Sequence, residues 1–224
     1  MTNPRIDFQS NCLDVINVLE SIRKRQIECK YVHISSAAVY GNPLELPISE
    51  SSLPNPLSPY GWHKLMLENL CKEYTSVYGI QTIVVRPFSV YGPGLKKQLF
   101  WDLYQKIKTN KDGMIDLWGT GRESRDFIYI DDLIRALHIL TEKASFNSEI
   151  YNLASGIETS ISEVIDVFVE SYDRSLIYSF NGNVREGNPV NWKADISKIE
   201  SIGFKTENSI QKGISKLTNW LKCI

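Results

Sequence analysis

The chain of 224 residues lacks several features that define particular protein classes. Its four cysteines show neither a CxxC spacing nor a paired framework, which argues against a disulfide scaffold and against zinc. No apolar stretch approaches the roughly 18 residues of a membrane span, and no signal-peptide pattern opens the chain. The net charge of −1, without runs of Lys or Arg, provides no basic field for nucleic acid. We therefore expect a cytoplasmic protein with no metal site, no nucleic-acid partner and no membrane partner.

A glycine-rich phosphate turn is also absent. A dinucleotide-binding α/β domain normally opens with a strand and a turn whose backbone N–H groups bind the pyrophosphate. Here the first glycines are Gly41, Gly61 and Gly79, and no glycines stand in a GxxGxxG arrangement. The sequence therefore does not predict a complete dinucleotide site in this chain.

The elements that are present alternate between helix and strand. Apolar spacing, β-branched runs and Pro or Gly boundaries predict helices over 9–28, 59–78, 98–109, 131–143, 161–172 and 208–222, and strands over 30–35, 80–85, 115–118, 150–153 and 175–180. The segment 41–58 is rich in Pro, Ser and Asn and is expected to be a loop. This order predicts an α/β fold: part of a Rossmann-like, doubly wound parallel sheet, with a smaller mixed α/β region.

Three polar residues suggest redox chemistry at a carbinol. Tyr60 and Lys64 stand four apart near the start of the helix over 59–78, so they share a face, and Ser36 follows the strand over 30–35. An adjacent ammonium favours phenolate, so we expect Lys64 to lower the tyrosine pKa of about 10 and make Tyr60 a general base. Taken alone, a Tyr and a Lys at this spacing are common on helices that only pack against a core.

Further motifs accompany this trio in a fixed order along the chain. They are Ser35-Ser36-Ala37-Ala38-Val39-Tyr40-Gly41, Pro47-Ile48-Ser49-Glu50, Arg86-Pro87-Phe88-Ser89-Val90-Tyr91-Gly92-Pro93-Gly94, Gly119-Thr120-Gly121-Arg122-Glu123-Ser124-Arg125-Asp126-Phe127, Tyr151-Asn152-Leu153-Ala154 and Arg185-Glu186-Gly187. Together they closely resemble the extended short-chain dehydrogenase/reductase family, the branch of the NAD-dependent epimerases and dehydratases. The resemblance extends over roughly residues 1–224.

The resemblance implies roles for individual residues. The catalytic residues would be Ser36, Tyr60 and Lys64; the cofactor-binding residues would be Tyr60, Lys64, Pro87, Phe88 and Asn11; the substrate-binding residues would be Ser36, Ser89, Leu117, Arg125, Arg185 and Asn188. The sequence departs from the family pattern at Ser89, where Asn is common, and at Asn188, where the family has Asp. His63 stands where Ser is frequent, and we expect it to pack or cap. We expect His33, in the middle of a strand, to belong to the core.

The resemblance also implies a function. Family dehydratases carry an Asp-Glu pair after the catalytic Ser or Thr, whereas this chain has Ala37 and Ala38, which cannot transfer protons. We therefore expect an NAD-dependent nucleotide-sugar epimerase-type enzyme, using NAD+ rather than NADP and a nucleotide-diphosphate sugar, with UDP-hexose the commonest class. An NDP-keto-sugar reductase is an alternative. A non-catalytic remnant that binds sugar nucleotide, or half of a split enzyme, is another.

The missing turn suggests a division of the chain. Residues 1–90 would be the C-terminal part of an NAD-binding domain, and 91–224 would mainly bind the nucleotide sugar, with parts of 127–155 packing back on the sheet. By this interpretation two to three βαβ units, roughly 80–100 residues, are lacking before Met1. The strand over 30–35 would then expose an unpaired edge, which predicts poor solubility or rescue by another chain, such as a complementing N-terminal chain. Separately, homodimers are usual in the family, so a homodimer is an alternative for the partner.

Overall fold

The computed structural model describes residues 3–109, 114–183 and 190–224. The elements are, in chain order, α1 (Pro4–Phe8), the π-helix η1 (Gln9–Leu13), α2 (Asp14–Arg25), β1 (Lys30–Ile34), the 3-10 helix η2 (Ala37–Val39), α3 (Pro59–Tyr78), β2 (Gln81–Pro87), β3 (Ser89–Tyr91), α4 (Gln98–Thr109), β4 (Met114–Leu117), β5 (Ser124–Tyr129), α5 (Ile130–Lys143), β6 (Asn147–Leu153), β7 (Glu158–Ser160), α6 (Ile161–Tyr172), β8 (Ile177–Phe180), α7 (Ser197–Ser201) and α8 (Ile210–Lys222). None of the helices in these ranges is long and apolar enough to cross a membrane.

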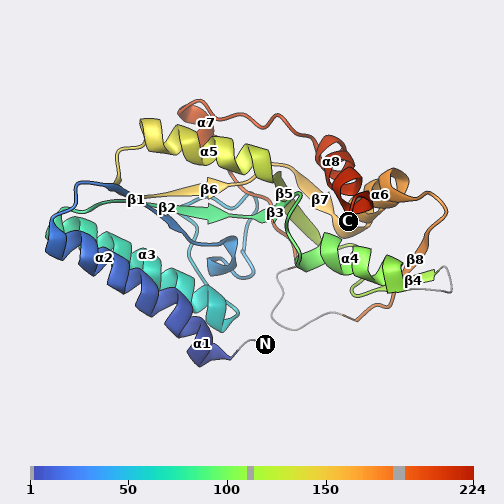
Figure 1. Ribbon diagram of the computed structural model, residues 1–224, viewed down its shortest axis with the longest axis horizontal. Coiled ribbons are helices and arrows are strands. Elements are labelled where there is room, and N and C mark those ends of the chain that lie inside the picture. Colours follow the sequence, from blue (N-terminus) through green and yellow to red (C-terminus); the bar gives the residue numbers. More distant parts are fainter. Residues whose placement is uncertain (1–2, 110–113, 184–189) are drawn as a thin grey trace.

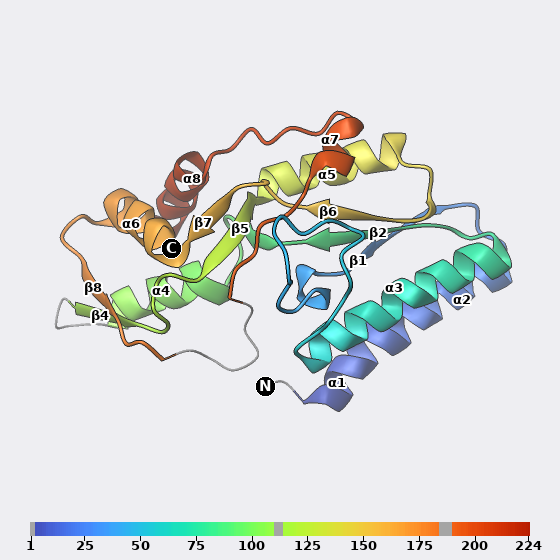
Figure 2. The same ribbon diagram turned by 180° about the vertical axis from the view of Figure 1, so that it is seen from behind.

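The first sheet is parallel and has the strand order β1-β2-β6. Its central strand carries Ile83, Val84 and Val85, which are fully or almost fully buried. Such a run of β-branched residues suits a strand that is covered on both faces. Helices α2 and α3 lie against one face, and α5 and α7 lie against the other (Figures 1 and 2). The predicted α/β class and parallel sheet are confirmed.

The second part of the molecule has smaller sheets. β3 pairs with β5 in parallel, β7 joins β5 antiparallel, and β4 pairs with β8 in parallel. A second apolar core, which includes Phe100, Phe168 and Leu217, joins these strands to α4, α6 and α8 (Figure 1).

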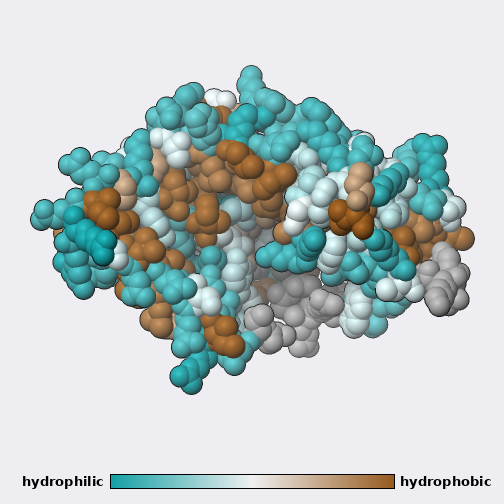
Figure 3. All heavy atoms as spheres, viewed as in Figure 1, coloured by the Kyte–Doolittle hydropathy of each residue, from teal (hydrophilic) through white to brown (hydrophobic). Residues whose placement is uncertain are grey.

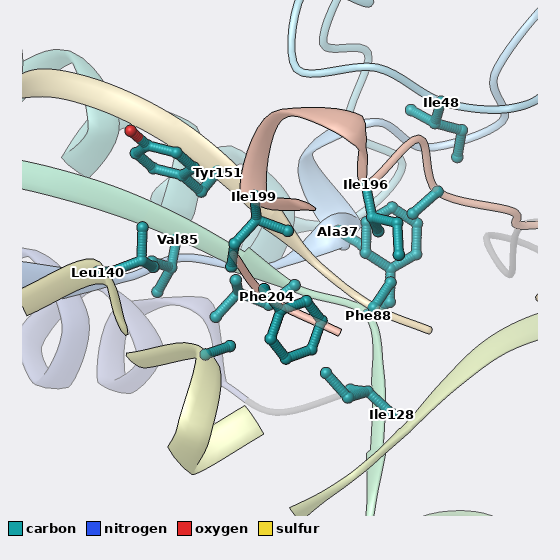
Figure 4. Close-up of a cluster of buried hydrophobic side chains, with 14 of the residues drawn as sticks. Ala37, Ile48, Val85, Phe88, Ile128, Leu140, Tyr151, Ile196, Ile199 and Phe204 are labelled. Atoms are coloured by element: carbon teal, nitrogen blue, oxygen red, sulfur yellow. The ribbon is translucent and has the colours of Figure 1, made fainter. Parts of the chain in front are cut away.

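A single residue separates the two parts of one extended segment. β2 ends at Pro87 in the first sheet, and β3 begins at Ser89 in the second. Between them, the Phe88 N–H donates to the Leu153 carbonyl at 3.0 Å, and the Phe88 ring packs edge-on against Trp192. Figure 4 shows Phe88 inside the buried cluster of the first part, near Ile196.

The expected free edge of the sheet is present at β1, which pairs with β2 alone among the described residues. The Ser35 N–H donates to the Val85 carbonyl at 2.8 Å. Because parallel pairing uses alternate residues, the backbone groups of Val32 and Ile34 point to the other side. Figure 3 shows apolar residues gathered in the middle of this face, between α5 and the α2–α3 pair. An apolar surface and an unpaired strand edge therefore lie on the same side of the molecule.

The element boundaries match the sequence in some places and differ in others. The helix over 59–78, its end at left-handed Gly79 and the helix over 98–109 are confirmed. The helix predicted over 9–28 starts earlier, because Asn3 caps it by accepting from the Arg5 N–H at 3.0 Å. It ends at Arg25, before Gln26 adopts a left-handed conformation. Strands β3, β5 and β7 were not predicted.

Candidate active site

Tyr60 lies in the first turn of α3, and the local sequence explains why. The Ser58 hydroxyl caps the helix by accepting from the Gly61 N–H at 3.2 Å, and Pro59 occupies the first helical position. Gly61 allows the close approach that the site requires, since a Cβ there would lie 2.7 Å from the Ala38 carbonyl oxygen. This contact brings the start of α3 against the turn that follows β1.

Ser36 occupies that turn. Its hydroxyl caps η2 by accepting from the Ala38 N–H at 3.2 Å. The Ser36 hydroxyl is also close enough to the Tyr60 phenol to contribute to lowering the pKa of the phenol. The structure thus brings Ser36 and Tyr60 together, as the sequence predicts, although they come from different elements.

Lys64 lies one turn further along α3. Its Nζ is 5.6 Å from the centre of the Tyr60 ring and donates to the Ile34 carbonyl of β1 at 2.9 Å. Burial lowers the pKa of Lys64, while the nearby Asp7 opposes this effect. An ammonium has three donors, so this hydrogen bond leaves further N–H groups for a ligand.

The expectation that Lys64 lowers the Tyr60 pKa in this chain is wrong. Burial has the largest effect and raises the pKa of Tyr60; the nearby Ser36 hydroxyl lowers it, and the negative charge of Asp7 raises it. The physical reason is that desolvation penalises the phenolate, while the Lys64 ammonium is directed to a backbone carbonyl. In the described structure Tyr60 is therefore held as the neutral phenol.

Asn11, predicted to bind cofactor, contacts a carboxylate close to this group. Its amide donates to the Asp7 carbonyl at 3.0 Å and to Asp7 Oδ1 at 3.1 Å. Asp7 Oδ2 accepts in turn from His63 Nδ1. Asn11 thus belongs to a polar cluster beside Lys64.

A cleft of about 1120 Å³ runs from Ser36 into the second part of the molecule. Several predicted substrate residues line it: Ser36, Ser89, Leu117 and Arg125, together with Phe88, which was predicted to bind cofactor. Pro87, Tyr60 and Lys64 are not in its lining, and Pro87 closes β2 next to Phe88. The cleft therefore combines groups from both sheets, and Ser36 is the member of the predicted catalytic set that lines it.

Arg125 supplies a positive charge to the cleft. Its Nη1 donates to the carbonyls of Ser124 (2.7 Å) and Val190 (3.1 Å), and its guanidinium carbon is 5.5 Å from the centre of the Trp192 ring. Burial lowers the pKa of Arg125. No ion pair among the described residues joins it to a carboxylate. Its remaining N–H donors are thus available to an anionic ligand.

Two predicted residues cannot be placed, and other cleft residues were missed. Arg185 and Asn188 lie outside the described residues. Trp192, Trp118 and Arg122 line the cleft but were not predicted. Trp192 stands in an irregular segment without periodicity; the signal that could have found it is an aromatic residue close to the Arg185 motif.

Comparisons with known proteins agree with this geometry. Residues 1–154 match the model of the NAD dependent epimerase/dehydratase family. A protein of Methanocaldococcus jannaschii, described as a candidate UDP-glucose 4-epimerase, is 34% identical over 98% of this chain and 72% of its own length. The GDP-6-deoxy-D-mannose reductase of Pseudomonas aeruginosa is 28% identical over 97% of this chain and 74% of its own length.

A solved structure gives the same result. The UDP-glucuronic acid 4-epimerase of Bacillus cereus, in complex with UDP-glucuronic acid and NAD, is 30% identical, with a TM-score of 0.87 over 96% of this chain and 68% of its own. The match covers both parts of the fold described above. The chain therefore belongs to the NAD dependent epimerase/dehydratase family.

Proposed function

We propose that this chain carries the catalytic and sugar-binding groups of a nucleotide-sugar 4-epimerase-type enzyme that uses NAD and acts on a UDP-hexose. The observation that supports this most directly is a cleft lined by both Ser36 and Arg125, with the Tyr60 phenol close to the Ser36 hydroxyl. A sugar hydroxyl placed at Ser36 and a diphosphate placed at Arg125 would fit one ligand. The cleft volume of about 1120 Å³ is slightly above the usual range of about 300–1,000 Å³ for ligand pockets, which suits a ligand as large as a nucleotide sugar.

The residues present fit the nicotinamide end of NAD. Lys64 has free N–H donors beside an exposed Tyr60, and Pro87 and Phe88 close the neighbouring strand. NAD, when bound, supplies the acceptor for the hydrogen removed from the sugar carbon and returns it afterwards. The pyrophosphate end has no glycine-rich turn among the 224 residues. Lys64 would contact the nicotinamide ribose, and Asn11 would support the same end.

The roles of the residues then follow from their chemistry. Tyr60 accepts the proton of the sugar hydroxyl during oxidation and returns it during reduction, which requires the phenolate form. Ser36 donates a hydrogen bond to the same sugar oxygen. The positive charge on the nicotinamide of bound NAD would offset the burial that raises the Tyr60 pKa.

At the other end of the cleft, Arg125 binds the diphosphate through its guanidinium fork. Ser89 assists it with a hydroxyl, and Leu117 flanks the base. Arg185 and Asn188 would contribute a second diphosphate contact and a ribose contact. Ala37 and Ala38 supply no acid or base for removing water, which favours epimerisation over dehydration.

Turnover by a complete enzyme tests the proposal. The NAD-binding segment of the B. cereus relative, joined ahead of Pro4, would provide the glycine-rich turn. We expect this enzyme to invert the configuration at C4 of UDP-hexose, and NMR of the sugar product measures the inversion. Tyr60→Phe should abolish turnover and leave UDP affinity largely intact, while Tyr78→Phe, near the far end of α3, serves as the control. Turnover of Tyr60→Phe within tenfold of the unchanged enzyme would rule out Tyr60 as the base.

A keto-sugar reductase is a second candidate. The similarity to the GDP-6-deoxy-D-mannose reductase of P. aeruginosa favours it. The structure of RMD from that organism, complexed with NADPH, has a TM-score of 0.89 over 99% of this chain. The same assay separates the two functions. A reductase would consume one reduced cofactor for each keto sugar, whereas an epimerase would consume none.

A further inference from the structure

A polar pair lies near Tyr60 and Lys64. Asp7 of α1 and His63 of α3 are joined through Oδ2 and Nδ1, and each side chain is 13% exposed. Because a carboxylate only accepts, the His63 ring nitrogen is the donor. Asn11 donates to the other Asp7 oxygen at 3.1 Å. The Asp7 carboxylate is therefore held by two donors on the side facing η1 and α3.

This pair is close enough to act on the phenol. His63 follows Tyr60 by three residues, so both lie on one face of α3. The negative charge of Asp7 raises the pKa of Tyr60 and also raises the pKa of Lys64. The Phe8 ring packs edge-on against the imidazole, with centroids 5.4 Å apart, and keeps the ring in place.

Other titratable groups face the same region. From η1, the buried Cys12 thiol lies 4.0 Å from the His63 carbonyl, and burial together with Asp7 raises its pKa. From β1, His33 is close enough to Lys64 for the ammonium to contribute to lowering the His33 pKa. Asp7 thus places a negative charge near Tyr60 and Lys64. In the proposed reaction Tyr60 must become a phenolate, whereas Lys64 must remain an ammonium.

We propose that His63, through Asp7, is a positioning residue for Tyr60: by binding the carboxylate, His63 keeps its negative charge away from the phenol and makes proton removal easier. The inference rests on the role proposed above for Tyr60. Without the imidazole, the carboxylate would lose its donor from α3 and turn toward the next cation on that helix, Lys64. Its charge would then oppose the phenolate more strongly.

Titration of Tyr60 in the 224-residue chain tests this directly. With 3,5-difluorotyrosine incorporated at position 60, fluorine NMR follows the phenol at a pH where the protein stays folded. We expect Asp7→Asn to lower the titration midpoint and His63→Ala to raise it, each by at least about 0.3 pH units. His63→Gln, which keeps a donor, should restore the midpoint. Asp14→Asn removes an exposed carboxylate of α2 and should change nothing.

The double variant Asp7→Asn/His63→Ala provides the decisive comparison. If His63 acts through Asp7, the Tyr60 titration midpoint of the double variant should equal that of the Asp7→Asn variant. An unchanged midpoint in Asp7→Asn, or equal midpoints in His63→Ala and His63→Gln, would overturn the proposal. The measurement needs no turnover. Failure of the Tyr60→Phe assay would therefore refute the proposed base without altering this electrostatic result.

Discussion

At the scale of single residues, His33 is a buried base whose Nε2 has no hydrogen-bond partner among the described residues. Burial, followed by the charge of Lys64, lowers the pKa of His33 to about 4 from 6.5. Between about pH 4 and pH 6.5, His33 therefore binds a proton in the unfolded chain but not in the folded chain. The stability from neutral His33 is fully present above pH 6.5 and is lost as pH falls toward 4.

Replacing His33 tests this assignment. We expect His33→Leu to remove a pH-dependent loss of roughly 3 kcal/mol at most. Urea unfolding at neutral pH and at about pH 5 measures the difference, and His138→Gln changes an exposed histidine as the control. If His33→Leu lost stability with falling pH as steeply as the unchanged chain, the assignment would be wrong.

Arg125 carries a second prediction at this scale. Arg125→Ala should weaken UDP binding about tenfold to a hundredfold, because hydrogen bonds to charged groups contribute about 1.5–3 kcal/mol. Arg125→Lys keeps the charge but loses the fork, so it should recover only part of the affinity. Calorimetry measures both variants. Arg174→Ala, which breaks a surface pair with Glu170 at 3.0 Å, is the matched control, and an equal loss there would contradict the assignment.

Ser36, Tyr60 and Lys64 could be identified from the sequence, but the direction of the Tyr60 pKa shift could not. Ser36, Tyr60 and Lys64 stand in recognisable motifs, and the structure brings them together. The direction of the Tyr60 pKa depends on how deeply the ring is covered and on Asp7, which lies 53 positions earlier in the chain. Local spacing contains no information about either. Trp192 reaches the cleft for a similar reason, since contacts from Gly41 and Phe88 place it.

At the scale of elements, a buried ion pair joins α3 to β2. Glu68 accepts from Arg86 Nε at 2.9 Å and Nη2 at 2.5 Å, and from the Ser35 hydroxyl at 2.5 Å. The Arg86 guanidinium also lies 4.6 Å from the centre of the Tyr40 ring. These contacts fix α3, and with it Tyr60, against the end of β1.

Removing one partner should therefore be costly. We expect Glu68→Ala to lower the free energy of unfolding by about 3–5 kcal/mol, since it leaves the Arg86 charge buried and unpaired. The double variant Glu68→Leu/Arg86→Met should regain most of that stability. Urea unfolding measures both, with Glu73→Ala on the exposed side of the same helix as the control. A loss below about 1 kcal/mol for Glu68→Ala would show that the pair does not hold the helix.

Long apolar elements could be predicted, and short polar ones could not. The strand over 80–85 and the helix over 59–78 have clear periodicity and Pro or Gly boundaries. β5 contains Ser124, Arg125 and Asp126, and two of these polar residues, Ser124 and Asp126, are buried. Asp126 accepts from the N–H groups of Ser155 (2.7 Å) and Ala194 (3.1 Å), so a distant segment stabilises it in a strand. No local pattern indicates that.

At the scale of the molecule, the free edge of β1 predicts self-association. Ile34 is 46% exposed, and no second strand pairs with β1 on its outer side within the described sheet. We expect the chain to associate with increasing concentration in sedimentation velocity and Ile34→Lys to reduce this. Leu44→Lys, which changes a fully exposed residue in the loop between η2 and α3, is the control. A monodisperse monomer at all concentrations would contradict the prediction.

Ligand binding gives the last prediction. The cleft is formed from described residues, whereas the glycine-rich turn is absent from the sequence. We therefore expect UDP to raise the melting temperature of the chain and NAD to leave it unchanged. A clear shift with NAD alone would show that other groups bind the pyrophosphate.

The single-residue connection at Phe88 has a mechanical consequence. The two sheets share one continuous stretch of backbone, and the only residue between its strands contributes its ring to the wall of the cleft. Any pivoting of one sheet against the other must turn that ring. A change in the width of the cleft would therefore also change the shape of its lining at Phe88.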